Sequence, residues 1–454
     1  MIERLCEVDR SRLDARLERE QELFTELHPR SRRLTAEARR CLLDAVPMPF
    51  MTEWPGGFPV YVAQAAGSGI VDIDGIEYAD FCLGDTGAMT GHAPPTVTTA
   101  LAKHARHGAT YMLPTADSVA VAEELQRRFG LPYWQFTVSA TDANRFALRI
   151  ARKITGRQRI LVFNWCYHGT IDEASVAMVD GEVQAREPNS GQPVSPAITT
   201  RVVEFNDFEG LKRALQQRDI ACLLAEPAMT NVGIIPPVAG FHEAMRELTQ
   251  RYGTLLIIDE THTLCAGSGG CTAAWSLDPD MVVLGKAIAA GIPAGTYGFS
   301  EEVARRLTAQ RGPDVSVTGG IGGTLAGNAL SARLMRVTLE TVLTKASFEH
   351  MITQAQRYQS GVEQAIQAAG IPWHVTRLGC RVEYRHQPAP PRNGSESMGA
   401  EDRHLAAFMH LFALNRGVLL TPFHNMALMC PDTTEEQVDR AVDSFAKATA
   451  EVIA

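Results

Sequence analysis

The sequence has 454 residues, of which 45% are hydrophobic and 21% are charged, as is ordinary for a globular protein with one large domain and a smaller one. Its formal net charge of −9 provides no general basic surface, so neither nucleic acid nor an anionic membrane is expected as a partner. No stretch reaches about 18 uninterrupted apolar residues, so no transmembrane helix is expected. The charged N-terminal residues also lack the apolar run of a secretory signal.

Residues 1–95 are predicted to form an N-terminal helix and part of a small domain. Residues 1–45 place leucines among charged residues, with no glycine and with no proline before Pro29, which indicates an amphipathic helix. We expect this helix to dock on the rest of the molecule or at a dimer edge. Residues 47–83 are rich in proline and glycine and contain the pattern GIVDIDG, which predicts a small antiparallel element.

Residues 96–335 are predicted to form the large domain. Short apolar strands alternate there with segments of helical period, which argues for a largely parallel sheet covered by helices on both faces. The predicted strands are FTVSA, RILVFNW, TTRVVEF, ACLLAEPA, TLLIIDE and MVVLGK.

Residues 336–454 are predicted to complete a smaller α+β domain that is shared with residues 47–83. One or two long helices are expected over residues 331–370, and a last helix over residues 434–454. The polar, proline-rich residues 386–403 predict a loop.

Several predicted strands deliver polar residues at their carboxyl ends, where open parallel sheets bind ligands. Asp259 ends a purely apolar strand, and a carboxylate there needs a cation or an N–H donor to remain charged. Lys286 follows the next apolar strand, where a lysine is costly to desolvate. The other residues expected to face the same crevice are Ser139, Ala140, Thr141, Tyr167, His168, Glu226 and Glu260.

Three of these features together predict pyridoxal 5'-phosphate as the cofactor. The helix that begins behind Ser139–Thr141 offers free N–H groups and its positive dipole end to a phosphate. A carboxylate at Asp259 can hold the proton of the ring nitrogen, which makes the ring an electron sink. The amine of Lys286 can form an imine with the cofactor and, when free, can act as a general base.

The motifs SATDA, YHG, AEP, LLIIDET, LGK and GGTLAGN, in this order, resemble the signature of the class III aminotransferases. The resemblance covers about residues 50–440, and the nearest branch is the glutamate-1-semialdehyde aminomutase group. It implies the α/β fold-type I architecture, with a mostly parallel, seven-stranded-type sheet in the large domain and a smaller α+β domain.

This resemblance also implies roles for individual residues. Lys286 corresponds to the Schiff-base lysine, Asp259 to the partner of the ring nitrogen, and Tyr167 to the aromatic side chain stacked on the ring. Ser139–Thr141 would surround the phosphate. The resemblance further implies a homodimer with active sites at the interface, in which Thr324 reaches the phosphate of the neighbouring subunit.

Some positions depart from the usual family pattern without removing a catalytic group. Ala140 stands where glycine is usual; alanine keeps its N–H but restricts φ. Thr261 stands where a valine usually presses on the ring face, so it is assigned to the cofactor site together with Glu226. The residues after the lysine are Ala287–Ala290 instead of a run of glycines.

The nine cysteines are odd in number and irregular in spacing, and several lie in apolar runs, as expected of reduced thiols in the cytoplasm. His262, Cys265 and Cys271 could suggest a metal cluster. They lack the paired spacing of a zinc site, so no metal is expected.

The cofactor is better defined by these patterns than the reaction is. The first hypothesis is a ping-pong aminotransferase that moves an amino group from an amine, or from a non-α amino acid such as a β-amino acid, to a keto acceptor. The alternative is an aminomutase of the glutamate-1-semialdehyde type or an amino-acid racemase. A third hypothesis, a non-catalytic scaffold, is disfavoured by the intact Lys286 and Asp259.

The preference for an amine or a non-α amino acid rests on missing arginines. Relatives commonly hold the substrate carboxylate with an arginine, but the early loop PMPFMTEWPGG and the late segment PFHNM contain none. Arg381 and Arg385 remain as candidate carboxylate binders. An apolar pocket is expected instead from Phe50, Met51, Trp54, Phe423 and Met426.

Overall fold

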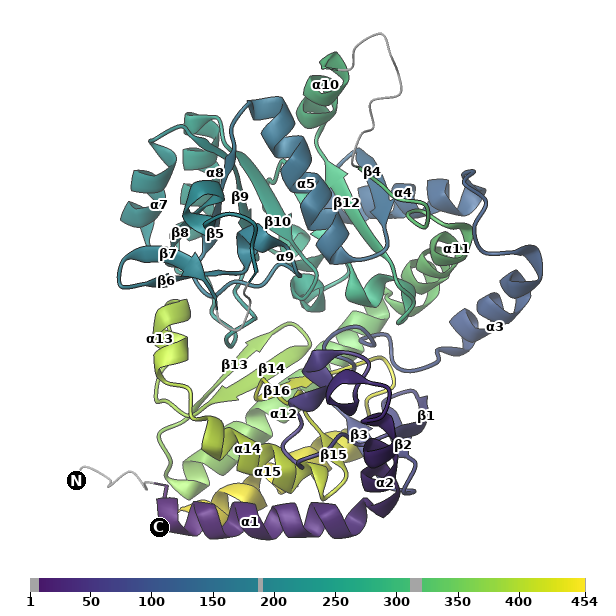
Figure 1. Cartoon of the computed structure of the whole chain (residues 1–454), viewed down its shortest axis with the longest axis vertical. Helices are drawn as coiled ribbons and strands as arrows, with labels where there is room; N and C mark the ends of the chain where they lie inside the picture. The colour runs from purple at the N-terminus through teal and green to yellow at the C-terminus, as the bar shows by residue number, and fades with distance from the viewer. Residues whose placement is uncertain (1–7, 187–190, 311–320, 454) are drawn as a thin grey trace. The chain divides into compact units, whose positions relative to one another are not determined.

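The computed structural model describes residues 8–186, 191–310 and 321–453. Contacts divide the chain into two compact units, whose elements are shown in Figure 1. Unit 1 comprises residues 1–94, 346–390 and 400–454, and unit 2 comprises residues 95–345 and 391–399.

Unit 2 is built, over its described residues, around a seven-stranded sheet. In chain order the strands are β4 (Tyr133–Thr137), β5 (Arg159–Phe163), β8 (Thr200–Val203), β9 (Ile220–Ala225), β10 (Leu255–Asp259), β11 (Met281–Leu284) and β12 (Gly295–Phe299). Their order across the sheet is β4-β12-β11-β10-β9-β5-β8, and only the pairings of β12 within this sheet are antiparallel. The predicted α/β fold with a mostly parallel sheet is therefore confirmed.

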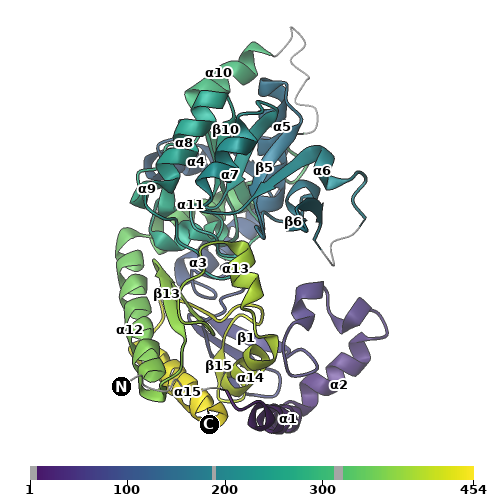
Figure 2. The same ribbon diagram turned by 90° about the vertical axis from the view of Figure 1, so that its left-hand side faces the viewer.

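Helices cover both faces of this sheet. In Figures 1 and 2, α5 (Ala140–Thr155) lies on one face, and α7 (Phe208–Leu215) and α8 (Phe241–Tyr252) lie on the other. The apolar stripe of α5 is buried against the strands, as its helical period predicts. The remaining helices of unit 2 are α3 (Pro95–His104), α4 (Ala116–Phe129), α6 (Pro196–Thr199), α9 (Gly270–Ala274), α10 (Glu301–Ala309), α11 (Ala329–Val337) and α13 (Gly394–Gly399), and a hairpin is formed by β6 (Val176–Val179) and β7 (Glu182–Ala185).

Strand β12 was not among the predicted strands. Its sequence, GTYGF, contains two glycines and too few apolar residues to predict a strand. Its glycines are explained by close packing. A Cβ atom at Gly298 would lie 2.7 Å from the ring of Trp134, and one at Gly295 would lie 2.4 Å from the backbone of Ser139. Such distances are far below van der Waals contact, so the tertiary packing requires glycine at both positions.

Unit 1 contains two smaller sheets in its described residues. The first has the order β1-β2-β3-β15, and the second has the order β13-β14-β16. Strands β1 to β3 are antiparallel, which confirms the element predicted within residues 47–83. The strands are β1 (Val62–Ala66), β2 (Gly69–Asp72), β3 (Glu77–Asp80), β13 (His374–Leu378), β14 (Arg381–Arg385), β15 (Val418–Leu419) and β16 (Met426–Leu428). The helices are α1 (Arg10–Leu27), α2 (Pro29–Ala38), α12 (Lys345–Ala369), α14 (Arg403–Leu414) and α15 (Glu435–Val452).

The helical pattern over residues 331–370 is broken in the structure. Helix α11 passes into a π-helical turn at Thr338–Val342, and α12 begins afresh at Lys345. The buried guanidinium group of Arg128 donates hydrogen bonds to the carbonyl oxygens of Leu339 at 2.6 Å and Leu343 at 3.0 Å. Arg128 therefore takes the place of the backbone N–H groups that would bond to these carbonyls in a continuous helix, so the helix can end here without leaving them unpaired.

A buried hydrogen-bonded chain joins the first two helices to the antiparallel strands of unit 1. His28, between α1 and α2, contacts the Phe24 carbonyl through Nδ1 at 2.7 Å and the Tyr78 hydroxyl through Nε2 at 2.8 Å. The Tyr78 hydroxyl also lies 2.8 Å from Asp72 Oδ2. Because these polar groups are buried, each needs its partner.

We expect the substitution Tyr78→Phe to lower the free energy of unfolding by about 1–3 kcal/mol, because it leaves buried His28 and Asp72 each without one hydrogen-bond partner. Urea denaturation of the full-length protein measures the change. The matched control is Tyr133→Phe, at an exposed position on β4, which should change the free energy by less than about 0.5 kcal/mol. Equal effects of the two substitutions would contradict a role for the buried chain.

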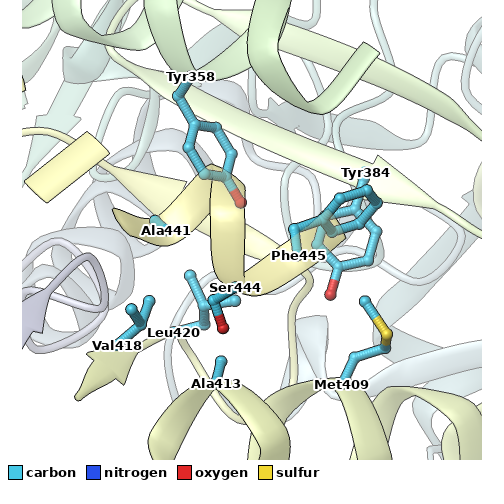
Figure 3. Close-up of a pocket in the computed structure, with 9 residues that line it drawn as sticks. All are labelled: Tyr358, Tyr384, Met409, Ala413, Val418, Leu420, Ala441, Ser444 and Phe445. Carbon is cyan, nitrogen blue, oxygen red and sulfur yellow. The ribbon is translucent and has the colours of Figure 1, made fainter. Parts of the chain in front are cut away.

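A small cavity in unit 1 is lined by apolar side chains together with three hydroxyl-bearing residues (Figure 3). The hydroxyl of Ser444 has no hydrogen-bond partner among the described protein atoms. The cavity has room for about one water molecule, which would satisfy this hydroxyl. It is too small to be a substrate site. Its lining residues are Tyr358, Tyr384, Met409, Ala413, Val418, Leu420, Ala441, Ser444 and Phe445.

Across the described residues, no helix offers the long apolar surface that spanning a bilayer demands. The same part of the chain holds no group of three or more His, Cys, Asp or Glu side chains arranged to bind a metal ion.

Candidate active site

Asp259, the last residue of β10, is buried and held by three hydrogen bonds. Its Oδ2 atom accepts a hydrogen bond from Asn144 Nδ2 at 2.8 Å and lies 2.9 Å from His168 Nδ1. Its Oδ1 atom accepts a hydrogen bond from the backbone N–H of Thr261 at 3.0 Å. Asn144 belongs to α5 and His168 follows β5, so three elements of unit 2 orient this carboxylate.

The electrostatics of this cluster favour an ionised Asp259. Burial alone would raise the pKa of its carboxyl group, but the hydrogen bond and charge of His168, with the hydrogen bonds from Thr261 and Asn144, lower it to about 2. Burial alone would lower the pKa of His168, but Cys166 and Asp259 raise it to about 10. The two side chains therefore form a buried ion pair that keeps a negative charge at the end of β10.

Glu226, directly after β9, lies in the same cluster. Its carboxylate accepts hydrogen bonds from the backbone N–H of Thr230 at 3.1 Å and from the Thr230 hydroxyl at 2.5 Å. Burial raises the pKa of Glu226 to about 7, with Asp259 adding to the increase and His168 and Thr230 opposing it. These two hydrogen bonds connect Glu226 to its own loop, while its charge is coupled to the Asp259–His168 pair.

The predicted phosphate turn forms the N-terminus of α5. Ser139 is the N-cap residue, and its hydroxyl accepts a hydrogen bond from the backbone N–H of Asp142 at 3.2 Å. Ala140 and Thr141 are the first two helical residues, so their N–H groups have no partner within the helix. The alanine at position 140 causes no strain, because its φ is not positive. This helix terminus is therefore suited to an anion.

Two glycines bring other parts of the site against this turn. A Cβ atom at Gly285 would lie 2.7 Å from Ala140 Cβ, and one at Gly169 would lie 2.1 Å from the Thr141 hydroxyl oxygen. Gly285 directly precedes Lys286, and Gly169 directly follows His168. The end of β11 and the loop after β5 therefore both lie against the start of α5, which brings the predicted phosphate, lysine and carboxylate positions together.

Lys286 begins a short 3₁₀ helix, Lys286–Ala289, two residues after the end of β11. Val283 pairs in register with Asp259 on the adjacent parallel strand, so Lys286 lies three residues past the partner of the carboxylate. The φ of Lys286 is +52°, a left-handed conformation that costs a non-glycine residue about 1–3 kcal/mol. Its Nζ atom lies 2.7 Å from His262 Nε2.

The turn after β10 is held by Glu260. This buried carboxylate accepts hydrogen bonds from the Thr263 hydroxyl and from the backbone N–H groups of Cys271, at 3.1 Å, and Thr272. Thr261 is buried, and its hydroxyl has no hydrogen-bond partner among the described protein atoms. An unpartnered buried hydroxyl next to Asp259 can bind a polar atom of a ligand.

The other two predicted site residues, Tyr167 and Thr324, lie in loops of unit 2. Tyr167 is half-buried in the loop after β5, directly before His168. Thr324 is exposed in a turn that follows Gly322 and Gly323, both of positive φ, and no hydrogen bond between described residues joins it to Asp259 or Lys286. The contact of Thr324 with a neighbouring subunit stays a prediction.

The expected substrate pocket needs correction within unit 1. Met426 and Arg381 are fully buried on the neighbouring strands β16 and β14, which argues against Met426 as a pocket wall and Arg381 as an accessible carboxylate binder. Phe50 and Phe423 are half exposed, with ring centroids 5.8 Å apart. These two aromatic side chains therefore lie near each other at the surface of unit 1, and their part in a substrate pocket stays a prediction.

Sequence reasoning missed Asn144 and His262 as parts of the site, and it placed His168 in the crevice without giving it a role. The signal for His168 was its place in the YHG motif, at a strand end. Asn144 and His262 had no comparable signal, because their partners lie 115 and 24 residues away along the chain.

The comparisons agree with this geometry. Residues 50–449 match the family described as "Aminotransferase class-III". The chain belongs to the class III aminotransferase family. The predicted family is thus confirmed, and the protein is an enzyme of this pyridoxal-phosphate-dependent class.

Relatives within the family carry more specific names. The chain is 33% identical over 402 residues to a glutamate-1-semialdehyde 2,1-aminomutase of Bacillus subtilis (strain 168), covering 87% of this chain and 91% of that protein. A solved structure of a glutamate-1-semialdehyde-aminomutase from Pseudomonas aeruginosa PAO1 is 48% identical with a TM-score of 0.96, covering 98% of this chain and 99% of the other.

Two further structures bear on the site. A K286A variant of the Pseudomonas aeruginosa protein, in complex with PMP, is 47% identical with a TM-score of 0.96, over 98% of this chain and 99% of the other. An omega-transaminase from Sphaerobacter thermophilus is 30% identical with a TM-score of 0.85, covering 93% of this chain and 97% of that one. The solved structures similar to this chain thus include proteins named as an aminomutase and as a transaminase.

The residues of the class III site fit pyridoxal phosphate, as predicted. The ionised Asp259 matches a protonated pyridine nitrogen, and the helix N-terminus at Ser139–Thr141 matches a phosphate. The unpartnered hydroxyl of Thr261 provides a further polar atom inside the site.

Proposed function

We propose that the protein is an aminomutase, which moves an amino group between two carbon atoms of one substrate. The observation that carries this proposal is the 48% identity to the Pseudomonas aeruginosa glutamate-1-semialdehyde-aminomutase over 98% of this chain. Three glutamate-1-semialdehyde 2,1-aminomutases are 32–33% identical to this chain, and the matches cover 91–100% of their length. The aminomutase therefore replaces the intermolecular transaminase as the first hypothesis.

Lys286 and Asp259 carry the main roles in this proposal. Pyridoxal phosphate, when bound, supplies an aldehyde for the lysine amine and an electron-withdrawing ring that stabilises negative charge on the substrate carbon. Lys286 holds the cofactor and moves protons at the substrate carbons once its amine is free. The variant of the Pseudomonas aeruginosa relative also replaces a lysine numbered 286, in a chain that aligns almost end to end with this one.

Asp259 keeps the proton on the ring nitrogen, and the surrounding residues keep Asp259 ionised. His168 and Asn144 orient its carboxylate, as their hydrogen bonds of 2.9 and 2.8 Å indicate. Glu226 acts on this charge through its position beside the Asp259–His168 pair. His168, Asn144 and Glu226 thus orient Asp259 or tune its charge, and they do not exchange protons with the substrate.

The remaining residues hold the cofactor in place. The N–H groups at the start of α5, together with the hydroxyls of Ser139 and Thr141, bind the phosphate. Tyr167 and Thr261 would lie against the ring of the bound cofactor. Thr324 contributes to the phosphate site of a second subunit, so the enzyme is proposed to work as a homodimer, and we place it in the cytoplasm.

A second candidate function is transamination of amines or β-amino acids. The observation that favours it is the half-exposed pair Phe50 and Phe423, which suits an aryl or alkyl group better than a carboxylate. The omega-transaminase at 30% identity is consistent with this candidate.

The two functions differ in whether a keto product is released. We expect the purified, cofactor-loaded enzyme to convert glutamate 1-semialdehyde into the isomer whose amino group has moved from carbon 2 to carbon 1, without any added keto acid. Isomer and keto product are quantified by chromatography in parallel reactions, one with the semialdehyde and one with an arylalkylamine plus pyruvate. The Lys286→Ala enzyme is the control for uncatalysed isomerisation.

Stoichiometric release of the ketone from the arylalkylamine, at a rate at least about tenfold above isomerisation, would establish the transaminase instead. Activity on neither substrate would reject both substrate assignments while leaving the cofactor site intact.

A further inference from the structure

The hydrogen bond between His262 and Lys286 places a second basic side chain on the amine proposed to hold the cofactor. The two nitrogens, Lys286 Nζ and His262 Nε2, are 2.7 Å apart. An ammonium group can only donate hydrogen bonds, so His262 accepts through Nε2 whenever Lys286 is charged. The contact therefore joins a nitrogen that donates a proton to one that can accept it.

The position of His262 is set by the turn in which it lies. Glu260, two residues earlier, anchors both sides of this turn through Thr263 and through the backbone of Cys271 and Thr272. The backbone N–H of Leu264 donates to the Glu260 carbonyl at 2.9 Å, and that of Cys265 donates to the His262 carbonyl at 3.3 Å. His262 therefore lies on a short segment whose backbone is held by several hydrogen bonds.

The position of Lys286 is equally constrained. Its backbone adopts a φ of +52°, and the preceding Gly285 packs directly against Ala140. A strained conformation persists only where the surroundings determine it. The backbone at both ends of the contact is thus constrained by the fold, in positions from which the two side-chain nitrogens lie 2.7 Å apart.

From this geometry we infer that His262 accepts the proton that Lys286 must lose before its amine can bond to the cofactor, and returns it when the amine is displaced. In the forward direction an N–H bond of the ammonium breaks, an N–H bond forms at His262 Nε2, and the positive charge passes from lysine to histidine. The neutral amine of Lys286 could then bond to the aldehyde that pyridoxal phosphate would supply, and its two hydrogens would leave with the aldehyde oxygen as water. This inference rests on the role of Lys286 in the proposed function and adds a catalytic residue to it.

The test measures cofactor attachment and not turnover. The full-length protein is freed of cofactor, mixed with pyridoxal phosphate in a stopped-flow spectrometer, and followed by the visible absorbance of the bound cofactor; borohydride reduction and mass spectrometry then verify covalent attachment. We expect His262→Ala to slow attachment by about 100-fold, as is typical for loss of a general base. The control His107→Ala, at an exposed position, should attach cofactor at the wild-type rate.

Two further measurements separate proton transfer from mere positioning. Imidazole added to His262→Ala should restore the rate in proportion to its concentration, whereas it should leave the His107→Ala rate unchanged. His262→Gln can still hydrogen-bond to Lys286 but takes up no proton, so it should remain about as slow as His262→Ala.

A wild-type rate in His262→Ala, full recovery in His262→Gln, or no effect of imidazole would each overturn the inference. The proposed function is tested independently, because attachment of the cofactor precedes both isomerisation and transamination. An enzyme that fails to isomerise the semialdehyde but shows slow, imidazole-rescued attachment in His262→Ala would reject the function and retain the role of His262.

Discussion

Replacement of Lys286 by alanine should abolish turnover, with a decrease in kcat/KM of at least about 100-fold. The physical reason is that the amine of Lys286, at the end of β11, is the group proposed both to bond to the cofactor and to move protons at the substrate. Among the described lysines, only Lys286 comes shortly after the strand that pairs with the end of β10 at Asp259. The measurement is a comparison of kcat/KM for the wild-type and variant enzymes on the same substrate.

A second readout makes this result specific to covalent attachment. After borohydride reduction, the wild-type protein should gain the mass of the reduced cofactor, and the Lys286→Ala protein should gain none. The matched control is Lys212→Ala, an exposed lysine on α7, which should retain both activity and the adduct. If the Lys286→Ala enzyme kept more than about a hundredth of the wild-type kcat/KM, the assignment of the lysine would be wrong.

Replacement of Asp259 by asparagine should leave the cofactor bound but lower kcat/KM by about 100- to 1,000-fold. Removing a single preorganised electrostatic group from an enzyme site typically has an effect of this size. The low pKa of Asp259, about 2, means that the wild-type enzyme presents a full negative charge at neutral pH. Asparagine keeps the shape of the side chain but removes that charge, so the ring nitrogen loses the partner that holds its proton.

The choice of asparagine separates chemistry from folding. Both Asp259→Ala and Asp259→Asn remove the counter-charge of the buried His168. Asparagine keeps an amide oxygen that can still accept a hydrogen bond from His168 or Asn144, whereas alanine leaves both donors without this partner. Thermal unfolding of Asp259→Asn, compared with the exposed control Asp278→Asn, reports whether the fold is retained. A folded Asp259→Asn enzyme with kcat/KM within about tenfold of the wild type would contradict the role of the carboxylate.

His168 and Asp259 differ in how strongly the sequence alone indicates a functional role. A carboxylate after an apolar strand is conspicuous, since nothing local accounts for its burial. A histidine in a glycine-containing loop is common and indicates no chemistry by itself. Only the folded chain shows that the histidine, 91 residues earlier, supplies the positive charge on which the ionisation of Asp259 depends.

The sequence by itself determined the fold class, the family and the cofactor. These conclusions rest on features that short segments carry, namely the alternation of strand and helix periods and the residues at each strand end, such as Asp259 and Lys286. Strand ends are informative because parallel strands bring their carboxyl ends to one edge whatever the details of packing. The helix N-terminus at Ser139 was readable for the same reason, since a cap is a local property.

The tertiary structure alone decided which residues hold those groups in place. The pairs Asn144–Asp259 and Lys286–His262 join segments that are separate in the sequence, so no local pattern encodes them. The same holds for β12, whose glycines are required by Trp134 and Ser139 and give no strand signal of their own. Local patterns specify elements, whereas hydrogen bonds and close contacts between distant segments depend on how the elements pack, and that packing sets the charge and geometry of the site.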